Sequence, residues 1–280
     1  MKTLPYPLSY KTIDGVEWEY ISTGKGKDTI VILPGGAQTD ESNFRFIRAF
    51  EDNYREIVLT IHNLDSTQEF NIVLNKILDT EKAQKVILYG LSMGGVLAQT
   101  FARDNPNRVK ALIISHSCTP NSQTYKREII VPLKLVKMAL PIISDWLIRF
   151  ISRFAAQIQG VSKSDTTKYF VPTNEQDSRY YQMIMQDYYR NFLDKRLLQT
   201  TIRIHLDFFK QELNPEDFSY LKRKVLILRT DNDRLMQDDG DFKRVYPAAQ
   251  VHTFLGTGHL SFYYQMEKMV EVIKVFLTRH

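Results

Sequence analysis

Short apolar runs alternate with amphipathic helical patterns through the first 115 residues, and this alternation constrains the fold more than any other feature of the chain. Strands are predicted over residues 29–33, 56–61, 86–91 and 111–115. Apolar residues at three- and four-residue spacings predict helices over residues 44–50, 70–78 and 93–102. Strand–helix–strand units of this kind build a mostly parallel sheet flanked by helices, so we expect an α/β fold.

The pattern changes after Cys118. Residues 119–218 contain long amphipathic stretches punctuated by prolines, but no convincing buried strand. Strand patterns return over residues 225–230 and 250–254, and a helical pattern over residues 264–277 follows them. We therefore predict a core of residues 1–118 and 219–280 that is interrupted by a helical insertion, residues 119–218.

The charge of the chain is spread along its length. Its 280 residues carry 37 Lys and Arg against 32 Asp and Glu, for a formal net charge of +5. The densest basic cluster, residues 222–224, precedes an apolar run and is explained as a solvated strand entry. Nucleic-acid binding requires a concentrated basic patch or a recognition motif. Neither is present, so no nucleic-acid partner is expected.

Cysteine usage and hydropathy bear on the compartment. A single cysteine, Cys118, cannot form an internal disulfide, and the first fifteen residues lack the apolar stretch of a signal peptide, so the cytoplasm is expected. The most apolar region, residues 129–154, is interrupted by Lys134, Lys137, Asp145, Arg149 and Arg153. We therefore expect no membrane span there, but peripheral contact with lipid is compatible with its apolar face.

A GxSxG motif at Gly90, Ser92 and Gly94 stands directly after a predicted strand and directly before a predicted helix. A serine on such a sharp turn has a strained backbone, and the two glycines remove side chains that would collide there. The hydroxyl then projects above the sheet. The N–H groups at the start of the next helix, that of Met93 among them, point to the same place and favour an oxyanion.

The motif and the residues that follow it resemble the α/β-hydrolase superfamily over nearly the whole chain. In that superfamily an acid follows a later strand and a histidine stands near the C-terminus. Asp233 follows the strand pattern of residues 225–230, and His259 lies between Gly258 and Leu260. The resemblance implies an α/β-hydrolase fold with a helical cap, formed here by residues 119–218. It also implies Ser92 as nucleophile, His259 as base and Asp233 as the acid. A glycine-flanked serine in an ordinary turn would not explain the two later features.

Alternatives exist for the acid and the base. Asp231, Asp238 and Asp239 are further candidate acids, but the spacing favours Asp233, and Asp231 is expected to hold the turn. Two histidines that follow predicted strands, His62 and His116, are expected to line the site or form hydrogen bonds there. Structural or solvated roles are expected for His205, His252 and His280.

The second oxyanion donor is expected in the loop after the strand of residues 29–33. There Pro34-Gly35 replaces the His-Gly that is frequent in the superfamily, and the match makes Gly36 the N–H donor alongside Met93. A phosphate-binding loop is the weaker interpretation, because neither GxGxxG nor a terminal Gly-Lys-Ser is present.

These residues predict hydrolysis of an ester, or a related acyl bond, of a small and largely apolar substrate, without a metal or an organic cofactor. The insertion is rich in aromatic residues that suit an apolar pocket, although packing is the commoner role for any one of them: Tyr169, Phe170, Tyr180, Tyr181, Tyr188, Tyr189, Phe192, Phe208 and Phe209. The same residues can act on thioesters, lactones or carbon–carbon bonds beside a ketone. A non-catalytic ligand-binding protein that retains the fold is the alternative from another class.

Overall fold

A computed structural model describes residues 6–36, 43–61, 63–123, 126, 130–151, 193–231, 233, 240–256 and 258–280 of the chain. His62, Asp238, Asp239 and the aromatic residues predicted to line the pocket between residues 169 and 192 lie outside the described residues.

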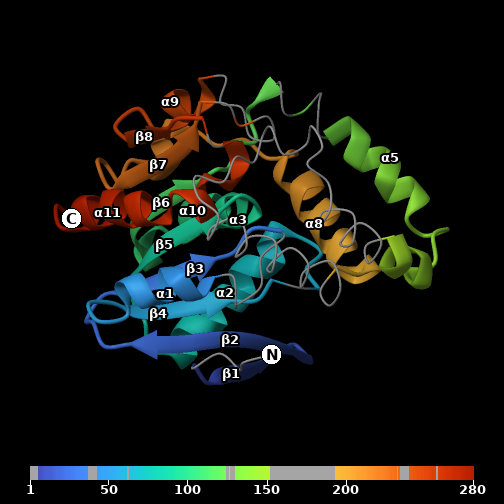
Figure 1. The fold of residues 1–280 in the computed structure, drawn as a ribbon, viewed down its shortest axis with the longest axis horizontal. Coiled ribbons are helices and arrows are strands. Elements are labelled where there is room, and N and C mark those ends of the chain that lie inside the picture. Colours follow the sequence, from blue (N-terminus) through green and yellow to red (C-terminus); the bar gives the residue numbers. More distant parts are fainter. Residues whose placement is uncertain are drawn as a thin grey trace.

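The described residues form an eight-stranded sheet in the order β1-β2-β4-β3-β5-β6-β7-β8 (Figure 1). The strands are β1 (Leu8–Ile13), β2 (Val16–Gly24), β3 (Thr29–Leu33), β4 (Arg55–Leu59), β5 (Val86–Leu91), β6 (Val109–Ser115), β7 (Val225–Thr230) and β8 (Gln250–Phe254). β2 pairs antiparallel with both β1 and β4, and all pairs from β4 to β8 are parallel. The predicted mostly parallel sheet is confirmed.

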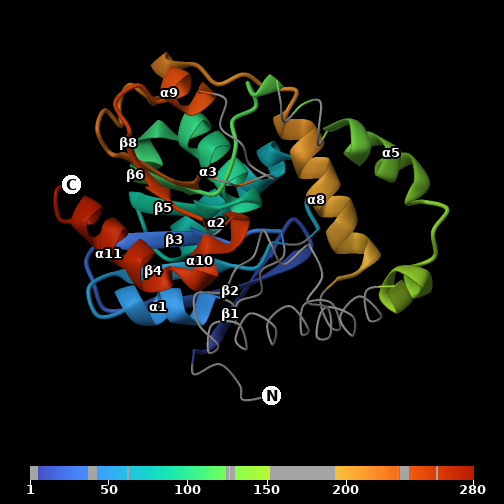
Figure 2. The same ribbon diagram turned by 45° about the horizontal axis from the view of Figure 1, so that its top comes forward.

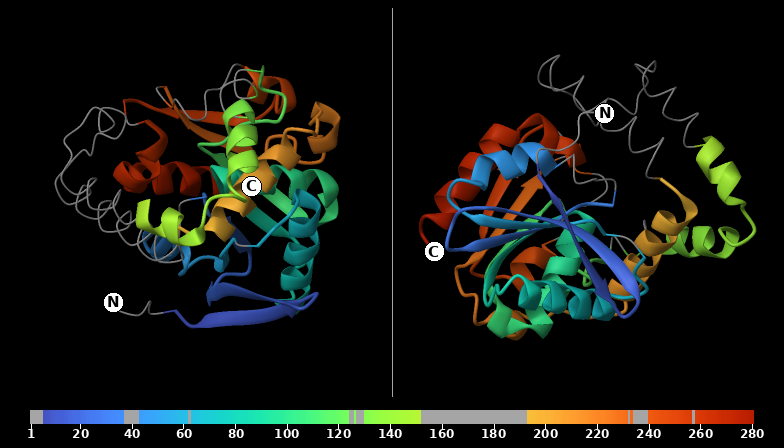
Figure 3. Two further views of the ribbon diagram at one scale, coloured as in Figure 1. Left: turned by 90° about the vertical axis from the view of Figure 1, so that its right-hand side faces the viewer. Right: turned by 90° about the horizontal axis from the view of Figure 1, so that it is seen from below.

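Helices cover both faces of this sheet. They are α1 (Phe44–Phe50), α2 (Thr67–Thr80), α3 (Met93–Asp104), α9 (Asp241–Val245), α10 (Ser261–Tyr264) and α11 (Met266–Leu277) in the core. The right panel of Figure 3 shows the sheet between α1 and α11 on one side and α2 and α3 on the other. The helical pattern predicted over residues 264–277 is shorter in the structure, because Gln265 separates α10 from α11.

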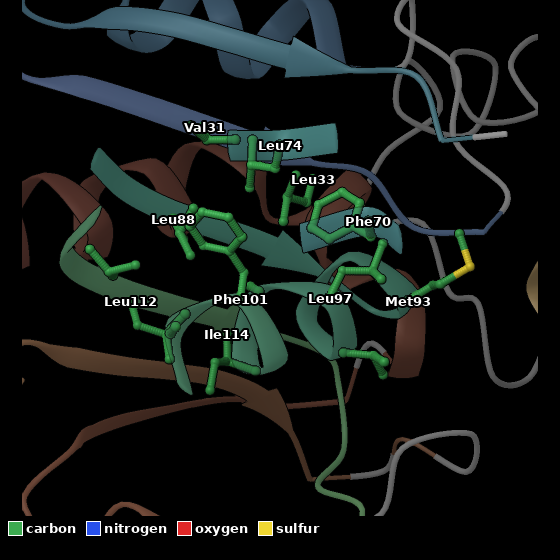
Figure 4. Packing of buried hydrophobic residues seen from close by; sticks show 14 of the residues in the cluster. Val31, Leu33, Phe70, Leu74, Leu88, Met93, Leu97, Phe101, Leu112 and Ile114 are labelled. Carbon is green, nitrogen blue, oxygen red and sulfur yellow. The ribbon is translucent and has the colours of Figure 1, made fainter. Parts of the chain in front are cut away.

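Two apolar layers hold the helices against the sheet. Side chains of α2 and α3, such as Phe70 and Phe101, pack against Leu88 and Leu112 of the central strands (Figure 4). On the opposite face, Ile273 of α11 belongs to the layer that covers β3, β4 and β5. Burial of alternate faces of the same strands fixes their register, because a one-residue slip would exchange the two layers.

The chain leaves the sheet after β6 and returns at β7. These strands are parallel neighbours, although a long segment separates them in sequence. The described part of that segment holds helices and no strand, with α5 (Val131–Ala139), a helical turn over residues 145–151 and α8 (Lys195–Phe208). Figure 2 shows α8 beside α3 and α5 farther from the sheet. Within the described ranges, no helix has both the length and the apolar character to cross a membrane.

Polar contacts fix α8 to the core. Asp207 of α8 accepts hydrogen bonds from the N–H (2.9 Å) and the hydroxyl (2.8 Å) of Thr67, the first residue of α2. The N–H of Leu64 donates to the hydroxyl of Thr200, 3.3 Å away. α8 is therefore anchored at the same end of the sheet as the start of α3.

Candidate active site

Ser92 forms the turn between β5 and α3 in a conformation that side-chain-bearing residues rarely adopt. Its φ is 50° and its ψ is −113°. The flanking glycines make the turn sterically possible. A Cβ on Gly94 would lie 2.0 Å from the carbonyl oxygen of Leu33, and a Cβ on Gly90 would lie 2.4 Å from that of Gly94. Strain of this kind persists only where surrounding contacts enforce it, and it marks functional turns.

The structure brings Ser92, His259 and Asp233 together. Nε2 of His259 lies 3.2 Å from Oγ of Ser92, and Nδ1 of His259 lies 2.8 Å from Oδ2 of Asp233. The imidazole is 12% exposed and the Asp233 side chain 3%, so the pair is largely shielded from water. Each residue follows a parallel strand, and the carboxyl ends of parallel strands share one edge of the sheet.

The alternative acid has a different contact. Oδ1 of Asp231 accepts a hydrogen bond from the N–H of Gly256 at 2.9 Å, and the N–H of Asp231 donates to the carbonyl of Phe254. Asp231 therefore joins the loops after β7 and β8, as expected of a turn residue.

The glycine loop after β3 lies beside Ser92. A Cβ on Gly35 would lie 3.4 Å from Cβ of Ser92, and one on Gly36 would lie 3.9 Å from Sδ of Met93. Met93 is the first residue of α3. The two residues expected to donate N–H groups thus come from neighbouring segments, and the partial positive charge of the α3 N-terminus is directed at the same place.

Thr201 of α8 was not singled out by sequence reasoning. A Cβ on Gly36 would lie 3.6 Å from both Oγ1 and Cγ2 of Thr201, so helix α8 of the insertion reaches the glycine loop. No motif identifies this residue, because its approach depends on how α8 packs against α3.

The remaining histidines have separate surroundings. His116, at the end of β6, is 1% exposed, and its ring stands edge-on to that of His259 with 6.1 Å between the centroids. The others pack elsewhere: Nδ1 of His205 contacts the carbonyl of Thr201, His252 packs on Phe254 and His280 on Phe276.

The described part of the chain contains neither a reactive thiol nor a cluster of metal ligands that would indicate another catalytic site. Burial raises the pKa of the Cys118 thiol, so it stays protonated. No group of three or more His, Cys, Asp or Glu among the described residues is arranged to hold a metal ion.

The chain belongs to the α/β-hydrolase fold family. The family's model, described as alpha/beta hydrolase fold, matches residues 28–265. The predicted α/β-hydrolase fold is confirmed, and the comparisons support a hydrolase.

Two relatives with the same name are similar to this chain over most of its length. A 2-hydroxy-6-oxononadienedioate/2-hydroxy-6-oxononatrienedioate hydrolase of Paraburkholderia phymatum is 26% identical, with 92% of this chain and 90% of the relative covered. A protein of the same name from Burkholderia vietnamiensis is also 26% identical, covering 95% and 93%.

Solved structures share the fold at lower identity. A hydrolase from Pseudomonas aeruginosa superposes with a TM-score of 0.74 at 16% identity, covering 96% of this chain and 98% of the other. The enol-lactonase from Burkholderia xenovorans gives a TM-score of 0.73 at 14% identity, covering 96% and 100%.

Proposed function

We propose that the chain is a serine hydrolase that cleaves an acyl bond through a covalent acyl-enzyme. One observation carries the proposal: a serine hydroxyl on a strained turn lies 3.2 Å from an imidazole whose other nitrogen is hydrogen-bonded to a buried carboxyl group. That arrangement of nucleophile, base and orienting acid supports proton transfer from the hydroxyl as it attacks a carbonyl carbon.

Each residue has a stated role in the proposed reaction. Nε2 of His259 takes the proton of Ser92 as Oγ attacks, and Asp233 orients the imidazole and stabilises its cation. The N–H groups of Met93 and Gly36 stabilise the oxyanion. His259 then protonates the leaving group. In the second half of the reaction, His259 takes a proton from the water that attacks the acyl-enzyme, and it returns a proton to Ser92 as the acid leaves.

The first candidate substrate is an ester of a small, largely apolar acid. The side chains of Leu91, Met93 and Thr201 lie against Gly35 and Gly36, and none of them is charged. The approach of Thr201 to Gly36 also supports the proposal that the insertion, residues 119–218, acts as a cap that limits the size of the acyl group.

An ester series tests this candidate. We expect p-nitrophenyl esters of two to eight carbons to be hydrolysed with a maximum kcat/KM at a short chain. Ser92→Ala should reduce turnover at least about 1,000-fold. Ser219→Ala is the matched control, because Ser219 is exposed and precedes the amino end of β7, whereas Asp233 follows the carboxyl end of that strand. Equal rates in the wild type and Ser92→Ala would reject the proposed nucleophile.

Carbon–carbon bond hydrolysis is the second candidate, and the named relatives favour it. Their names describe ketone-bearing diacids without an ester, so hydrolysis of such a molecule must break a carbon–carbon bond. A 2-hydroxy-6-oxo-dienoate, whose conjugated absorbance disappears on cleavage, distinguishes the candidates. A kcat/KM for this compound well above that for every ester would favour carbon–carbon hydrolysis over ester hydrolysis. An unchanged absorbance would reject carbon–carbon hydrolysis.

We also propose that the surface around α5 contacts anionic lipid. Large apolar side chains are exposed there: Val131, Leu135, Val136, Met138, Ile142, Trp146, Phe150 and Ile151. Lys134 and Lys137 lie on the same helix, and neither forms an ion pair with a described residue. An apolar face with aromatic residues and neighbouring lysines is complementary to an anionic bilayer surface.

Vesicle sedimentation tests the lipid contact. We expect binding to phosphatidylglycerol vesicles but not to phosphatidylcholine vesicles, and loss of binding in Trp146→Ala and in Lys134→Glu/Lys137→Glu. Failure to bind phosphatidylglycerol vesicles would reject the proposal. A concentration-dependent dimer that Trp146→Ala abolishes, without vesicle binding, would assign the surface to a second copy of the chain instead.

A further inference from the structure

Three consecutive residues contact both the Ser92 turn and the segment that carries His259: Ser115, the last residue of β6, and the next two, His116 and Ser117. We call these three residues the β6 end. Two of them hold the backbone of Ser92. Its N–H donates to the carbonyl of Ser115 at 2.8 Å, and the hydroxyl of Ser117 donates to the carbonyl of Ser92 at 2.8 Å. The backbone of the strained turn is therefore hydrogen-bonded on both sides.

The third residue, His116, contacts the segment that carries the proposed base. Its Nε2 is hydrogen-bonded to the hydroxyl of Ser261, which stands two residues after His259 at the start of α10. Its Nδ1 lies 2.8 Å from the hydroxyl of Ser115. His116 and Ser261 are each 1% exposed, so water does not compete for these bonds.

The backbone of His116 is also fixed. Its N–H donates to the carbonyl of Leu228 in β7 at 2.8 Å, and its φ is 47°, in the left-handed region. The ring is enclosed by those of Phe254, His259 and Phe262, with centroids between 5.9 and 6.2 Å away. The imidazole therefore cannot move without loss of contacts to β8 and α10.

His116 stays neutral while His259 changes charge. The pKa of His116 is lowered to about 3, mainly by burial and further by His259, while Asp233 acts in the opposite direction. A neutral imidazole has one donor and one acceptor nitrogen, and the hydroxyls of Ser115 and Ser261 can each fill either role. The bridge therefore persists throughout the proposed proton transfers without adding a second positive charge beside His259.

From these contacts we infer that His116 is a positioning residue, which ties the segment bearing His259 to the same β6 end that holds Ser92. The inference rests on the proposed function. The hydroxyl–imidazole distance is set by two loops that are far apart in the sequence, and the Ser261–His116–Ser115 bridge fixes one loop relative to the other. Displacement of a catalytic group by about 1 Å costs on the order of 100-fold in rate.

Two variants remove the bridge from its two sides. His116→Phe keeps the ring volume and removes both hydrogen bonds, whereas Ser261→Ala removes one of them with little change in packing. We expect each to lower kcat about 10- to 100-fold with KM nearly unchanged. The double variant should be no slower than the slower single variant, because His116→Phe already removes the His116–Ser261 hydrogen bond that Ser261→Ala removes. His252→Phe is the control, because the ring of His252 contacts Phe254 but takes no part in the Ser261–His116–Ser115 bridge.

Rates are normalised to the number of sites that react with a fluorophosphonate, so that a loss of folded protein is not counted as a loss of rate. We also expect the pH midpoint of kcat/KM to fall in both variants, because a loosened His259–Asp233 pair stabilises the imidazolium less. Wild-type kcat per reactive site and a wild-type midpoint in both variants would overturn the inference. A wild type that neither reacts with the probe nor turns over any substrate would reject the proposed function instead.

Discussion

Glu56 is the second residue of β4, which lies between β2 and β3, and its side chain is completely buried. Neither of its carboxyl oxygens has a hydrogen-bond partner among the described residues. Burial raises the pKa of this carboxyl group from 4.5 to about 9, and the nearby Glu51 adds to the increase. A charged carboxylate without a partner is expensive to bury, so the group is protonated in the folded protein at neutral pH.

The shift has a definite sign for stability. The folded state retains the proton up to about pH 9, whereas the unfolded state releases it near pH 4.5. Between these values the folded state binds more protons, so the free energy of unfolding must fall as the pH rises. Between pH 5 and pH 8 the free energy of unfolding therefore falls by at most about 4 kcal/mol, because each pH unit contributes at most about 1.36 kcal/mol.

Glu56→Gln removes this titration and keeps the shape of the side chain. Urea unfolding at pH 5 and pH 8 measures the difference for each protein, and we expect the wild type to lose up to about 4 kcal/mol more than Glu56→Gln. Glu17→Gln, at an exposed position of the neighbouring β2, should keep the wild-type difference. Equal losses in the wild type and Glu56→Gln would refute the reasoning, because the carboxyl group would then not be held protonated by the fold.

Two further predictions concern the candidate site. Asp233→Asn should lower kcat/KM for an ester about 1,000- to 10,000-fold, because the imidazole loses its orienting carboxylate. Asp231→Asn only weakens a turn and should lower kcat/KM far less. Similar losses for the two variants in steady-state assays would contradict the assignment of the acid. Gly94→Ala should abolish activity and lower the thermal unfolding midpoint, since its methyl group would lie 2.0 Å from the carbonyl of Leu33; retention of both would show that the motif glycine is not sterically required.

The centre of the sheet was predictable from sequence. β3, β5, β7 and β8 and helix α1 have the predicted bounds. β3, β5 and β7 are buried on both faces, and such strands read as continuous apolar runs. The β1–β2 hairpin was not assigned. Its exposed and buried residues alternate weakly, and the turn at Asp14-Gly15, with φ of 51° and 82°, was the local signal for it.

The candidate site was predictable only in part. Ser92, Asp233 and His259 could be named because a motif and an order along the chain identify them. The contacts of Ser117, Ser261 and Thr201 could not, because they depend on which strands are neighbours and on how α8 packs. His116 was expected near the site, but its bridge to Ser261 required the pairing of β6 with both β5 and β7. The substrate depends on side chains that no local pattern specifies.

Covalent labelling tests the central claim most directly. A fluorophosphonate reacts with a serine hydroxyl only when a base activates it and an oxyanion site receives the phosphoryl oxygen. We expect one label per chain by intact mass, on the peptide that contains Ser92, and an unchanged label in Ser219→Ala. Ser92→Ala, folded as judged by its unfolding midpoint, should remain unlabelled. A folded wild type that takes up no label, or a label that persists in Ser92→Ala, would contradict the assignment of Ser92 as the nucleophile.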